Sequence, residues 1–590
     1  MKVLKITIII ALIVLAWLTL SSFLFLSFAK LDGTNATPLT GFQYFMAYRD
    51  DRATMKILTL SHLIPAVVLF TLAFMVVMPK KKKLHGDARM ATRTEIKKAG
   101  MFETDGVLVG KLGKQALYMA GHYHLLLAAP TRGGKGVSIV VPVCLTYPDS
   151  MIVLDTKVEN FGITSGFRKE NGQDVFCFNP APSNYKTHRW NPLGYISEDK
   201  NLRIDDVQKI SNFLIPTPHT GDPMWSSEAR KLFEGIVLML IDLKEHPVTL
   251  GEVYRQVHTK EETSDYLKSM LEENEGVLSP LTQMAFTGFI ETASKTRSGI
   301  LASLKTALNI FANPLIDSAT STNDFDLREI RRKRTTIYIS ITIDNLIRLA
   351  PIINLFFQQV IDLNTRTLPE QDKTLKHNVL LLMDEFTAIG RIPVLAKGVG
   401  MIAGYGIQLM PIIQSPTQLK ATYKEDADTF LENMHLRIIF RPINMKVATE
   451  IANELGNVTI KQKSRSKKRS GWDSGNETVS DQKRQLLLPQ EIRDMKDDKA
   501  ILLHWKLKPI DADRFFYYDE QQFKDRLLDP IEIPEIHVKE HEQRGGEKVE
   551  IEINEVLENI TVDLNSNTVL SDEQIEVAAN DFLNYITATS

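Results

Sequence analysis

The stretch YHLLLAAPTRGGKG (123–136) decides the fold of this chain, because it joins an apolar run to a glycine-rich loop and a lysine. A phosphate-binding loop needs small residues so that backbone N–H groups can surround phosphate oxygens. It also needs a lysine for the β- and γ-phosphates and a helix N-terminus behind it. Residues 123–129 predict the strand, Gly133 and Gly134 the bend, and Val137 onward the helix. The stretch therefore predicts an α/β nucleotide-binding fold.

The loop departs from the usual sequence at two positions. Ala129 stands where the first glycine is usual, and Gly136 replaces the serine or threonine whose hydroxyl binds Mg²⁺. The other loop positions keep the required chemistry, and Lys135 is the predicted catalytic lysine. The residues predicted to contact the nucleotide are Thr131, Arg132, Gly133, Gly134, Lys135, Gly136 and Val137.

A second apolar run, NVLLLMDE (378–385), ends in two acids. It predicts a buried strand that places Asp384 where its carboxylate can hold Mg²⁺, and Glu385 where it can polarise the attacking water. The alternative is an apolar strand that ends in a surface turn. Gln414 follows another apolar run, 409–413, and is predicted to sense the γ-phosphate; a hydrogen-bonded turn residue is its alternative.

Other candidate groups also follow apolar runs. Asp155 and Lys157 come after the run 151–154, and open α/β sheets bind ligands at the carboxyl ends of their strands. Asp155 is therefore predicted to line the nucleotide site, with simple strand-end polarity as the alternative. A trans arginine often stabilises transition-state charge in multi-subunit motors. No spacing rule chooses among the candidates Arg391, Arg437 and Arg441.

Two long uncharged runs precede the phosphate loop. Residues 6–29 and 57–78 are each long enough to cross a hydrocarbon core about 30 Å thick at roughly 1.5 Å per residue. Lysines precede the first run and four more follow the second at 80–83, so the positive-inside rule predicts both termini in the cytoplasm and an external loop at 30–56. The alternative for the first run is a cleaved secretory signal ending near Ala29.

Composition excludes several function classes. The 590 residues suggest several domains, and a formal net charge of −2 shows no global basic field for nucleic acid. Cys144 and Cys177 lie in apolar contexts, which favours core residues over a disulfide framework or a zinc site. Cys-x-x-Cys spacing is absent, and the one His-x-x-x-His pair among the thirteen histidines, His537 and His541, lies in a charged segment near the C-terminus, so the sequence predicts no transition-metal centre.

Strand-like and helix-like runs alternate from about residue 116, which predicts a parallel sheet covered on both faces. Residues 203–318 are helical almost throughout and predict an inserted all-α domain, after which TIYISI (336–341) resumes the sheet pattern. The predicted domains are a transmembrane anchor (1–83), a first part of the nucleotide-binding domain (84–202), the all-α domain (203–318), a second part of the nucleotide-binding domain (319–530) and an acidic tail (531–590).

Two segments have a biased charge. Six lysines and arginines crowd residues 461–469, which predicts a mobile basic loop. Residues 531–590 hold fourteen acids against three bases, a net charge of −11, and predict a partly disordered tail in which 571–585 can form one amphipathic helix.

Several motifs together resemble those of the type IV secretion coupling proteins, the membrane-anchored ATPases of conjugative DNA transfer. The resemblance covers nearly the whole chain up to about residue 528. The residues that carry it are Gly86-Asp87-Ala88-Arg89-Met90-Ala91-Thr92, the loop 129–136, Val153-Leu154-Asp155-Thr156-Lys157, Phe178-Asn179-Pro180, Trp190-Asn191-Pro192-Leu193, Leu382-Met383-Asp384-Glu385-Phe386, Gly404-Tyr405-Gly406-Ile407, Gln414-Ser415 and Tyr517-Tyr518-Asp519.

The resemblance implies a RecA-like P-loop NTPase core with an inserted all-α domain and an N-terminal two-helix transmembrane anchor. It implies ATP and Mg²⁺ as cofactors, a homo-hexamer, and a multi-pass location in the bacterial inner membrane with the bulk in the cytoplasm. The family's loop tolerates glycine at position 136. Some members carry a trans arginine nineteen residues after the first acid of the pair, but this chain has Ala403 there.

The implied function is to recruit a relaxase–DNA complex or effector proteins and to couple ATP hydrolysis to their delivery into a type IV secretion channel. One alternative is a nucleotide-ordered membrane receptor that docks substrates without acting as a motor. Another alternative is a chromosome-segregation DNA pump. Such pumps generally carry more membrane spans and a C-terminal winged helix, and no such ending is visible in this sequence. To bind single-stranded DNA, the protein needs positive charge only along the lumen of its channel. The basic segment 461–469 can line that lumen. The alternatives are that it contacts anionic lipid or is a solvated loop. The acidic tail suits basic partners or adaptors.

Overall fold

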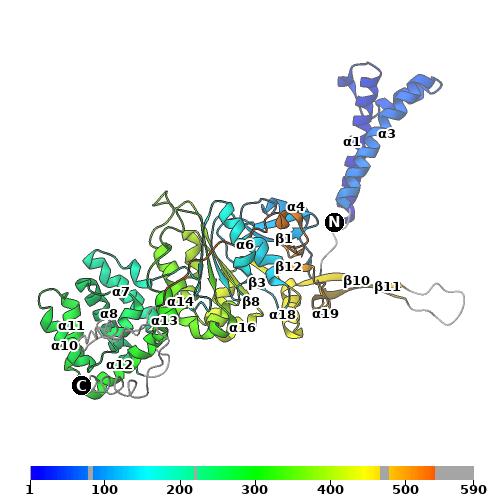
Figure 1. The fold of residues 1–590 in the computed structure, drawn as a ribbon. Helices are drawn as coiled ribbons and strands as arrows, with labels where there is room; N and C mark the ends of the chain where they lie inside the picture. The colour runs from blue at the N-terminus through cyan, green and yellow to red at the C-terminus, as the bar shows by residue number, and fades with distance from the viewer. Residues whose placement is uncertain (1, 78–83, 218–221, 466–476, 539–590) are drawn as a thin grey trace, which may run out of the picture. The chain divides into compact units, whose positions relative to one another are not determined.

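The computed structural model describes residues 2–77, 84–217, 222–465 and 477–538 (Figure 1). The chain divides into two compact units. One comprises Met1–Asp87 with Asn457–Arg484, and the other comprises Ala88–Gly456 with Gln485–Ser590. The second unit contains the phosphate loop and the acid pair.

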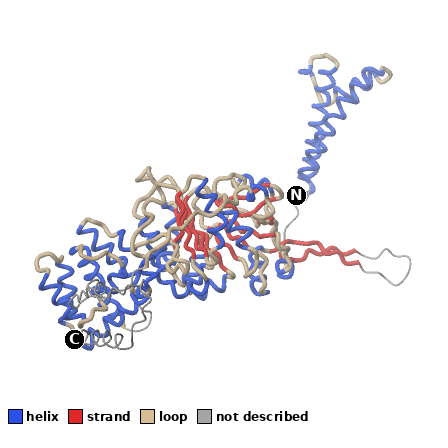
Figure 2. The backbone as a smooth tube through the Cα atoms, viewed as in Figure 1, coloured by secondary structure: helices blue, strands red, loops and turns tan. Residues whose placement is uncertain are grey.

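An eleven-stranded sheet runs through the second unit, in the order β2-β1-β13-β12-β9-β3-β8-β7-β4-β6-β5 (Figures 1 and 2). Neighbours from β9 to β5 pair parallel, and those from β2 to β9 on the other side pair antiparallel. The strands are β1 (Val107–Leu112), β2 (Gln115–Met119), β3 (Leu125–Ala128), β4 (Ser150–Asp155), β5 (Asp174–Phe178), β6 (Thr335–Ser340), β7 (Val379–Met383), β8 (Ile407–Ile413), β9 (Leu436–Ile439), β12 (Lys499–His504) and β13 (Ile510–Asp513).

The parallel strands are apolar along their whole length because helices cover both faces of the sheet. In β7, Leu381 and Met383 belong to the core shared with α14 (Ile343–Asn364) and α15 (Pro393–Ile402). Leu380 and Leu382 belong to the core on the opposite face, with α5 (Val141–Cys144). The remaining helices of this α/β core are α4 (Arg93–Lys98), η2 (Gly136–Val140), α6 (Glu159–Glu170), η5 (Phe386–Ile389), η6 (Ala403–Tyr405), α16 (Pro416–Tyr423), α17 (Asp426–Glu432), α18 (Met445–Leu455), α19 (Pro489–Arg493) and α20 (Gln521–Lys524).

The predicted all-α insertion is present, and the described residues between β5 and β6 contain no strand (Figure 2). Its central helix α8 begins at Pro223, where the Asp222 carboxylate caps the first turn, and Gly235 on α8 approaches α11 closely. Trp225 packs over Gly299 of α12 and is partly buried against the core. The helices are η3 (Pro192–Tyr195), α7 (Lys200–Leu214), α8 (Pro223–Leu243), α9 (Leu250–Gln256), α10 (Thr263–Glu273), α11 (Pro280–Glu291), α12 (Ser294–Leu308), η4 (Asn309–Ala312) and α13 (Pro314–Ala319).

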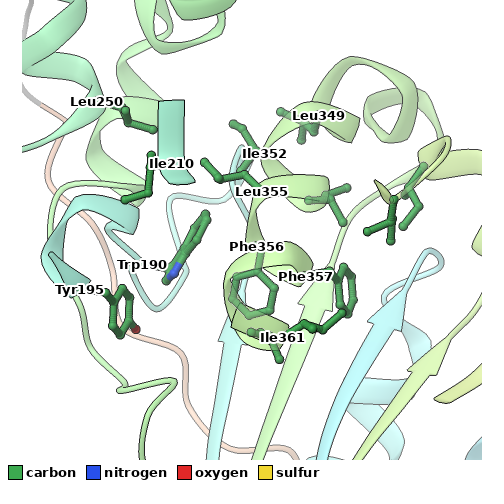
Figure 3. Close-up of a cluster of buried hydrophobic side chains, with 14 of the residues drawn as sticks. Trp190, Tyr195, Ile210, Leu250, Leu349, Ile352, Leu355, Phe356, Phe357 and Ile361 are labelled. Carbon is green, nitrogen blue, oxygen red and sulfur yellow. The ribbon is translucent and has the colours of Figure 1, made fainter. Parts of the chain in front are cut away.

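The motif Trp190-Asn191-Pro192-Leu193 joins the insertion to the core. Trp190 is fully buried against Phe356 of α14, with ring centroids 5.0 Å apart (Figure 3). The backbone N–H of Asn191 donates to the side chain of Asn323, at 2.7 Å, and the Asn191 amide donates to Val248 O at 2.9 Å. The start and the end of the insertion are therefore fixed to one another and to the helix that covers the sheet.

The first unit contains two long apolar helices, α1 (Lys2–Phe28) and α3 (Arg52–Val77). They pack together, and the Trp17 indole N–H donates to His62 O at 2.9 Å. The predicted external loop 30–56 is partly helical, because η1 (Gly33–Asn35) and α2 (Thr40–Tyr48) fold within it and α3 begins at residue 52.

Two helices among the described residues are long and apolar enough to cross a membrane. One is Arg52–Leu69, within α3, and the other is α14, which is mostly buried as the core helix of the α/β domain. The described apolar part of α1, Leu12–Phe28, is shorter. Together, α1 and α3 fit the predicted N-terminal anchor by composition.

The basic segment is not a loop throughout. Residues 461–465 belong to β10 (Asn457–Arg465), which pairs with β11 (Glu477–Gln485) in a two-stranded sheet. The prediction of a mobile loop is wrong for these five residues, because backbone pairing with β11 holds them in a strand; 466–469 lie outside the described residues. Gly86, which lies in the same unit as β10, is bonded to this strand: Thr459 N donates to Gly86 O. Gly86 has a φ of +121°, and a Cβ there would meet Asn457 O at 2.4 Å.

The first residues of the predicted acidic tail pack on the body. Thr187 N donates to Pro534 O, and Ile536 N donates to Tyr185 O. Ile536 is buried. Residues 539–590, including the predicted amphipathic helix at 571–585, lie outside the described residues. Both cysteines are buried and free, as predicted.

His124 ties the phosphate-loop strand to its neighbours. Its Nε2–H donates to Val399 O at 2.6 Å, and its Nδ1 accepts from Leu409 N at 3.0 Å. This pair of bonds needs the neutral ring. Burial lowers the pKa of His124 to about 4.

We expect His124 to make the protein less stable in mild acid. Its folded-state pKa lies below the unfolded value near 6.5, so the stability it contributes is complete above that pH and is lost as the pH falls toward 4, by about 3 kcal/mol in all. Thermal unfolding of His124→Asn, whose amide oxygen can still accept from Leu409, should show a flatter pH profile between 6.5 and 4. The exposed neighbour variant His122→Gln should keep the wild-type slope; equal slopes in all three proteins would contradict the assignment.

Candidate nucleotide-binding site

The phosphate loop lies between β3 and a helix that begins with one π-helical turn, η2, and continues as α5. Gly133 N donates to Pro130 O at 2.9 Å, which closes a tight turn. Arg132 and Gly134 both have positive φ, 59° and 76°. Thr131 and Arg132 are exposed, and Val137 O accepts from Tyr517 N. The backbone thus curls ahead of a helix N-terminus, as the sequence predicted.

The three glycines of the loop are not equivalent. A Cβ on Gly133 would meet Pro130 O at 2.8 Å, and a Cβ on Gly134 would meet an Arg514 nitrogen at 2.6 Å. Around Gly136 no atom lies within 4 Å of such a Cβ. The loop therefore requires glycine at 133 and 134, whereas position 136 has room for a side chain.

Lys135 bonds to both predicted acids. Its Nζ lies 2.6 Å from Asp384 Oδ1 and 2.5 Å from Glu385 Oε1. Burial alone would lower the pKa of Lys135, but the two adjacent carboxylates outweigh it and raise the pKa. The ammonium group is therefore held in its charged form next to the acid pair.

The strand order explains how residues 250 positions apart meet. β8 lies between β3 and β7, and all three are parallel, so their carboxyl ends share one edge. Asp384 continues the alternation of Leu380 and Leu382, which faces α5 and the loop. Glu385 has a φ of 51°, and this left-handed turn ends the strand and brings the second carboxylate to the same lysine.

Gln414 lies at the end of β8, between the loop and the acids. Its Nε2 donates to Glu385 Oε2 at 3.3 Å, and its side chain is exposed. The structure thus brings Lys135, Asp384, Glu385 and Gln414 into one cluster. The role of Gln414 as a γ-phosphate sensor stays a prediction.

Asp155 is buried at the end of β4, next to β7. Its carboxylate accepts from the Asn160 amide and from Phe161 N, at the start of α6. Burial raises the pKa of Asp155 to about 6, and the nearby Asp384 carboxylate adds to the shift. Lys157 is exposed. Both oxygens of Asp155 are engaged locally, so its contact with a nucleotide stays a prediction.

The donor set at this edge fits Mg²⁺ better than a transition metal. The described residues contain no group of three or more histidine, cysteine or acidic side chains suited to a metal, whereas Mg²⁺ usually takes one or two carboxylates and completes its shell with water and substrate phosphates. Asp384 and Glu385 supply carboxylates. The Thr156 hydroxyl, directly after β4, is buried without a hydrogen-bond partner among the described residues.

Each candidate trans arginine pairs with an acid of its own chain. Arg391 donates to Asp426 at 2.5 Å, Arg437 pairs with Glu454, and Arg441 lies 3.2 Å from Asp497. Ala403, at the position where some relatives carry the arginine, lies at the end of α15. The geometry of one chain does not choose among the three.

One side chain at the loop was missed by the sequence analysis. Arg514, directly after β13, donates to Gly133 O at 2.7 Å and to Gly134 O at 3.0 Å. An isolated arginine matches no phosphate-binding motif, and it lies 380 residues from the loop in sequence. The only signal near it was the motif Tyr517-Tyr518-Asp519, which begins three residues later.

The loop, the acid pair one strand away and the parallel sheet define a RecA-like P-loop NTPase fold with an all-α insertion. A family model described as Type IV secretory system conjugative DNA transfer matches residues 80–539. The chain belongs to this family of type IV secretion coupling proteins.

Curated relatives and solved structures agree with this family. Protein VirD4 of Rhizobium radiobacter is 32% identical over 476 residues, covering 78% of this chain and 68% of the relative. Conjugal transfer protein TraG of Escherichia coli is 26% identical over 458 residues, covering 70% and 72%.

Two solved structures of the conjugative coupling protein TrwB share the fold, each with 17% identity and a TM-score of 0.55. An unbound form covers 74% of this chain and 94% of its own. A form described in complex with ADP and Mg²⁺ covers 74% and 95%.

Substitutions at two loop glycines should show which position has room for a side chain and which requires the backbone conformation of glycine. We expect Gly136→Ser to fold and bind nucleotide like the wild type, because its Cβ meets open space. Gly134→Ala should weaken nucleotide binding by at least about tenfold, because alanine disfavours positive φ and its Cβ would displace Arg514. Titration with ATP and thermal unfolding of both variants check this; loss of binding in Gly136→Ser would contradict the room seen at that position.

Proposed function

We propose that this protein is a membrane-anchored ATPase that couples ATP hydrolysis to the delivery of substrates into a type IV secretion channel. The observation that supports it is the cluster of Lys135 with Asp384 and Glu385 at the carboxyl edge of the sheet. Membership of the conjugative DNA transfer family supports the substrate class, which is a relaxase–DNA complex, effector proteins or both.

Each group in the cluster has a distinct part in phosphoryl transfer. The loop N–H groups and Lys135 hold the β- and γ-phosphates, Asp384 holds Mg²⁺, and Glu385 orients and polarises the attacking water. A magnesium ion held by Asp384 would supply charge neutralisation at the phosphates. Gln414, bonded to Glu385, positions that carboxylate against the γ-phosphate.

The remaining parts of the proposal concern assembly and partners. We infer that α1 and α3 make a multi-pass anchor in the bacterial inner membrane, with the bulk in the cytoplasm. The working form is a homo-hexamer in which a trans arginine completes each site. Single-stranded DNA contacts a positive lumen, and the acidic tail recruits channel components, adaptors or basic substrate proteins.

A second candidate is a receptor that uses nucleotide only to order itself. One observation favours it: Lys135 is bonded to both acids. Phosphate binding has to exchange these partners, and such an exchange changes the site even without hydrolysis.

ATP turnover separates the two candidates. We expect the purified protein to hydrolyse ATP faster with single-stranded DNA than without it. Lys135→Ala should lose nucleotide binding, because the loop loses its phosphate cation. Glu385→Gln should keep binding but lose turnover on the order of 100-fold or more, because the general base is gone.

Steady-state phosphate release and nucleotide titration measure both effects on the same preparations. Gly136→Ser is the matched control, since it alters the loop without removing a charge. A rate that is low, independent of DNA and unchanged in Lys135→Ala and Glu385→Gln supports the receptor instead.

A further inference from the structure

Arg514 lies behind the phosphate loop and bonds to it from the side of the C-terminal strands. Besides the carbonyls of Gly133 and Gly134, its guanidinium donates to Ser138 Oγ at 2.8 Å and to Asp497 O at 2.6 Å. Ser138 Oγ in turn donates to Gly134 O at 2.7 Å. The guanidinium thus bonds to the Gly133 carbonyl and shares the Gly134 carbonyl with the helix, whose Ser138 N donates to Gly134 O at 3.1 Å.

These bonds set the direction of the loop amides. In a planar trans peptide the C=O and the following N–H point to opposite sides. Because Gly133 O and Gly134 O point toward Arg514, the N–H groups of Gly134 and Lys135 point away from it. Those N–H groups are the donors that a phosphate oxygen needs.

Among the described residues, Arg514 forms no ion pair with a carboxylate, although Asp497 and Asp498 favour its charged form from beyond ion-pair distance. Among the described residues, no acidic oxygen lies within 4.0 Å of the guanidinium in an ion pair, and the nearby Asp497 carboxylate pairs with Arg441 instead. Arg514 is only 5% exposed and stacks on Phe440, whose ring centroid is 3.7 Å from its central carbon. Burial lowers the pKa of Arg514 to about 10, which leaves it charged at neutral pH.

We propose that Arg514 is a positioning residue for nucleotide phosphates, which orients the loop amides and supplies a fixed positive charge behind them. This inference rests on the proposed function, because it assigns a residue to the same nucleotide site. An unpaired cation in a buried position is costly. Triphosphate charge on the other side of the loop compensates it.

If the positive charge of Arg514 helps to bind nucleotide, its removal has an effect that the loss of a purely structural residue would not have. A fixed cation attracts ATP more strongly than ADP, because ATP carries one more negative charge. Removal of the charge should therefore weaken ATP more than ADP. We expect Arg514→Met to weaken ATP on the order of 10- to 100-fold and ADP less, with a raised KM and a kcat changed by no more than a few fold.

The experiment uses the full-length protein in detergent, with ATP and ADP affinities measured by calorimetry and KM and kcat from phosphate release. Arg514→Lys keeps the charge without the guanidinium fork, so it should recover a large part of the ATP-over-ADP preference. Arg526→Met is the matched control. Arg526 also bonds to a backbone carbonyl, Leu145 O, and stacks on an aromatic ring, but at the other end of the same helix.

Each outcome decides the proposal. A selective loss for ATP in Arg514→Met, recovery in Arg514→Lys and wild-type affinities in Arg526→Met support it. Equal losses for ATP and ADP, no loss, or a lysine variant as weak as the methionine variant overturn it. If Arg514→Met does not fold, the ATP-to-ADP ratio of Arg514→Lys against Arg526→Met decides. If the wild type binds neither nucleotide, the proposed function fails instead.

Discussion

The bonds between Lys135 and the acid pair are the constraint on which the rest of the structure depends. A lysine with a side chain only 12% exposed needs a charged partner, because an unpaired buried charge is costly. Asp384 and Glu385 provide that partner only if the loop and the end of β7 share one edge of the sheet. Parallel pairing of β3, β8 and β7 meets this condition, and apolar strands covered on both faces keep the edge in place.

The same constraint explains how the chain tolerates an insertion between β5 and β6. The Trp190-Asn191-Pro192-Leu193 motif ties the start of the insertion to Asn323 near its end and to α14. The sheet therefore closes as if the two parts of the nucleotide-binding domain were continuous. This motif is a structural joint, which accounts for an aromatic ring and two turn-forming residues in one place.

The sequence predicted the parts of the site but not their arrangement. Apolar runs ending at 128, 383 and 413 were visible as strands, since burial on both faces leaves no polar alternation, and the residues that follow these runs carry the predicted chemistry. No local sequence pattern indicates the strand order, in which β8 lies between β3 and β7. Arg514 was missed for the same reason, since its role depends on a fold contact across 380 residues. The strand at 461–465 was predicted as a loop because it is rich in lysine. A charged composition indicates that a segment is exposed to solvent, but it does not show whether the backbone pairs with another strand.

The bonds of Lys135 and Glu385 also bear on the difference between a motor and a receptor. One oxygen of Glu385 is bonded to Lys135 and the other to Gln414. In the proposed reaction, nucleotide phosphates would compete for Lys135, and this exchange would free the Glu385 oxygen that Lys135 now holds. Arg514 is bonded to the Gly133 and Gly134 carbonyls and to neither acid, so the proposed exchange does not involve it. In a motor, the same charged residues would first bind the nucleotide and then activate its hydrolysis. A receptor would need only the binding step.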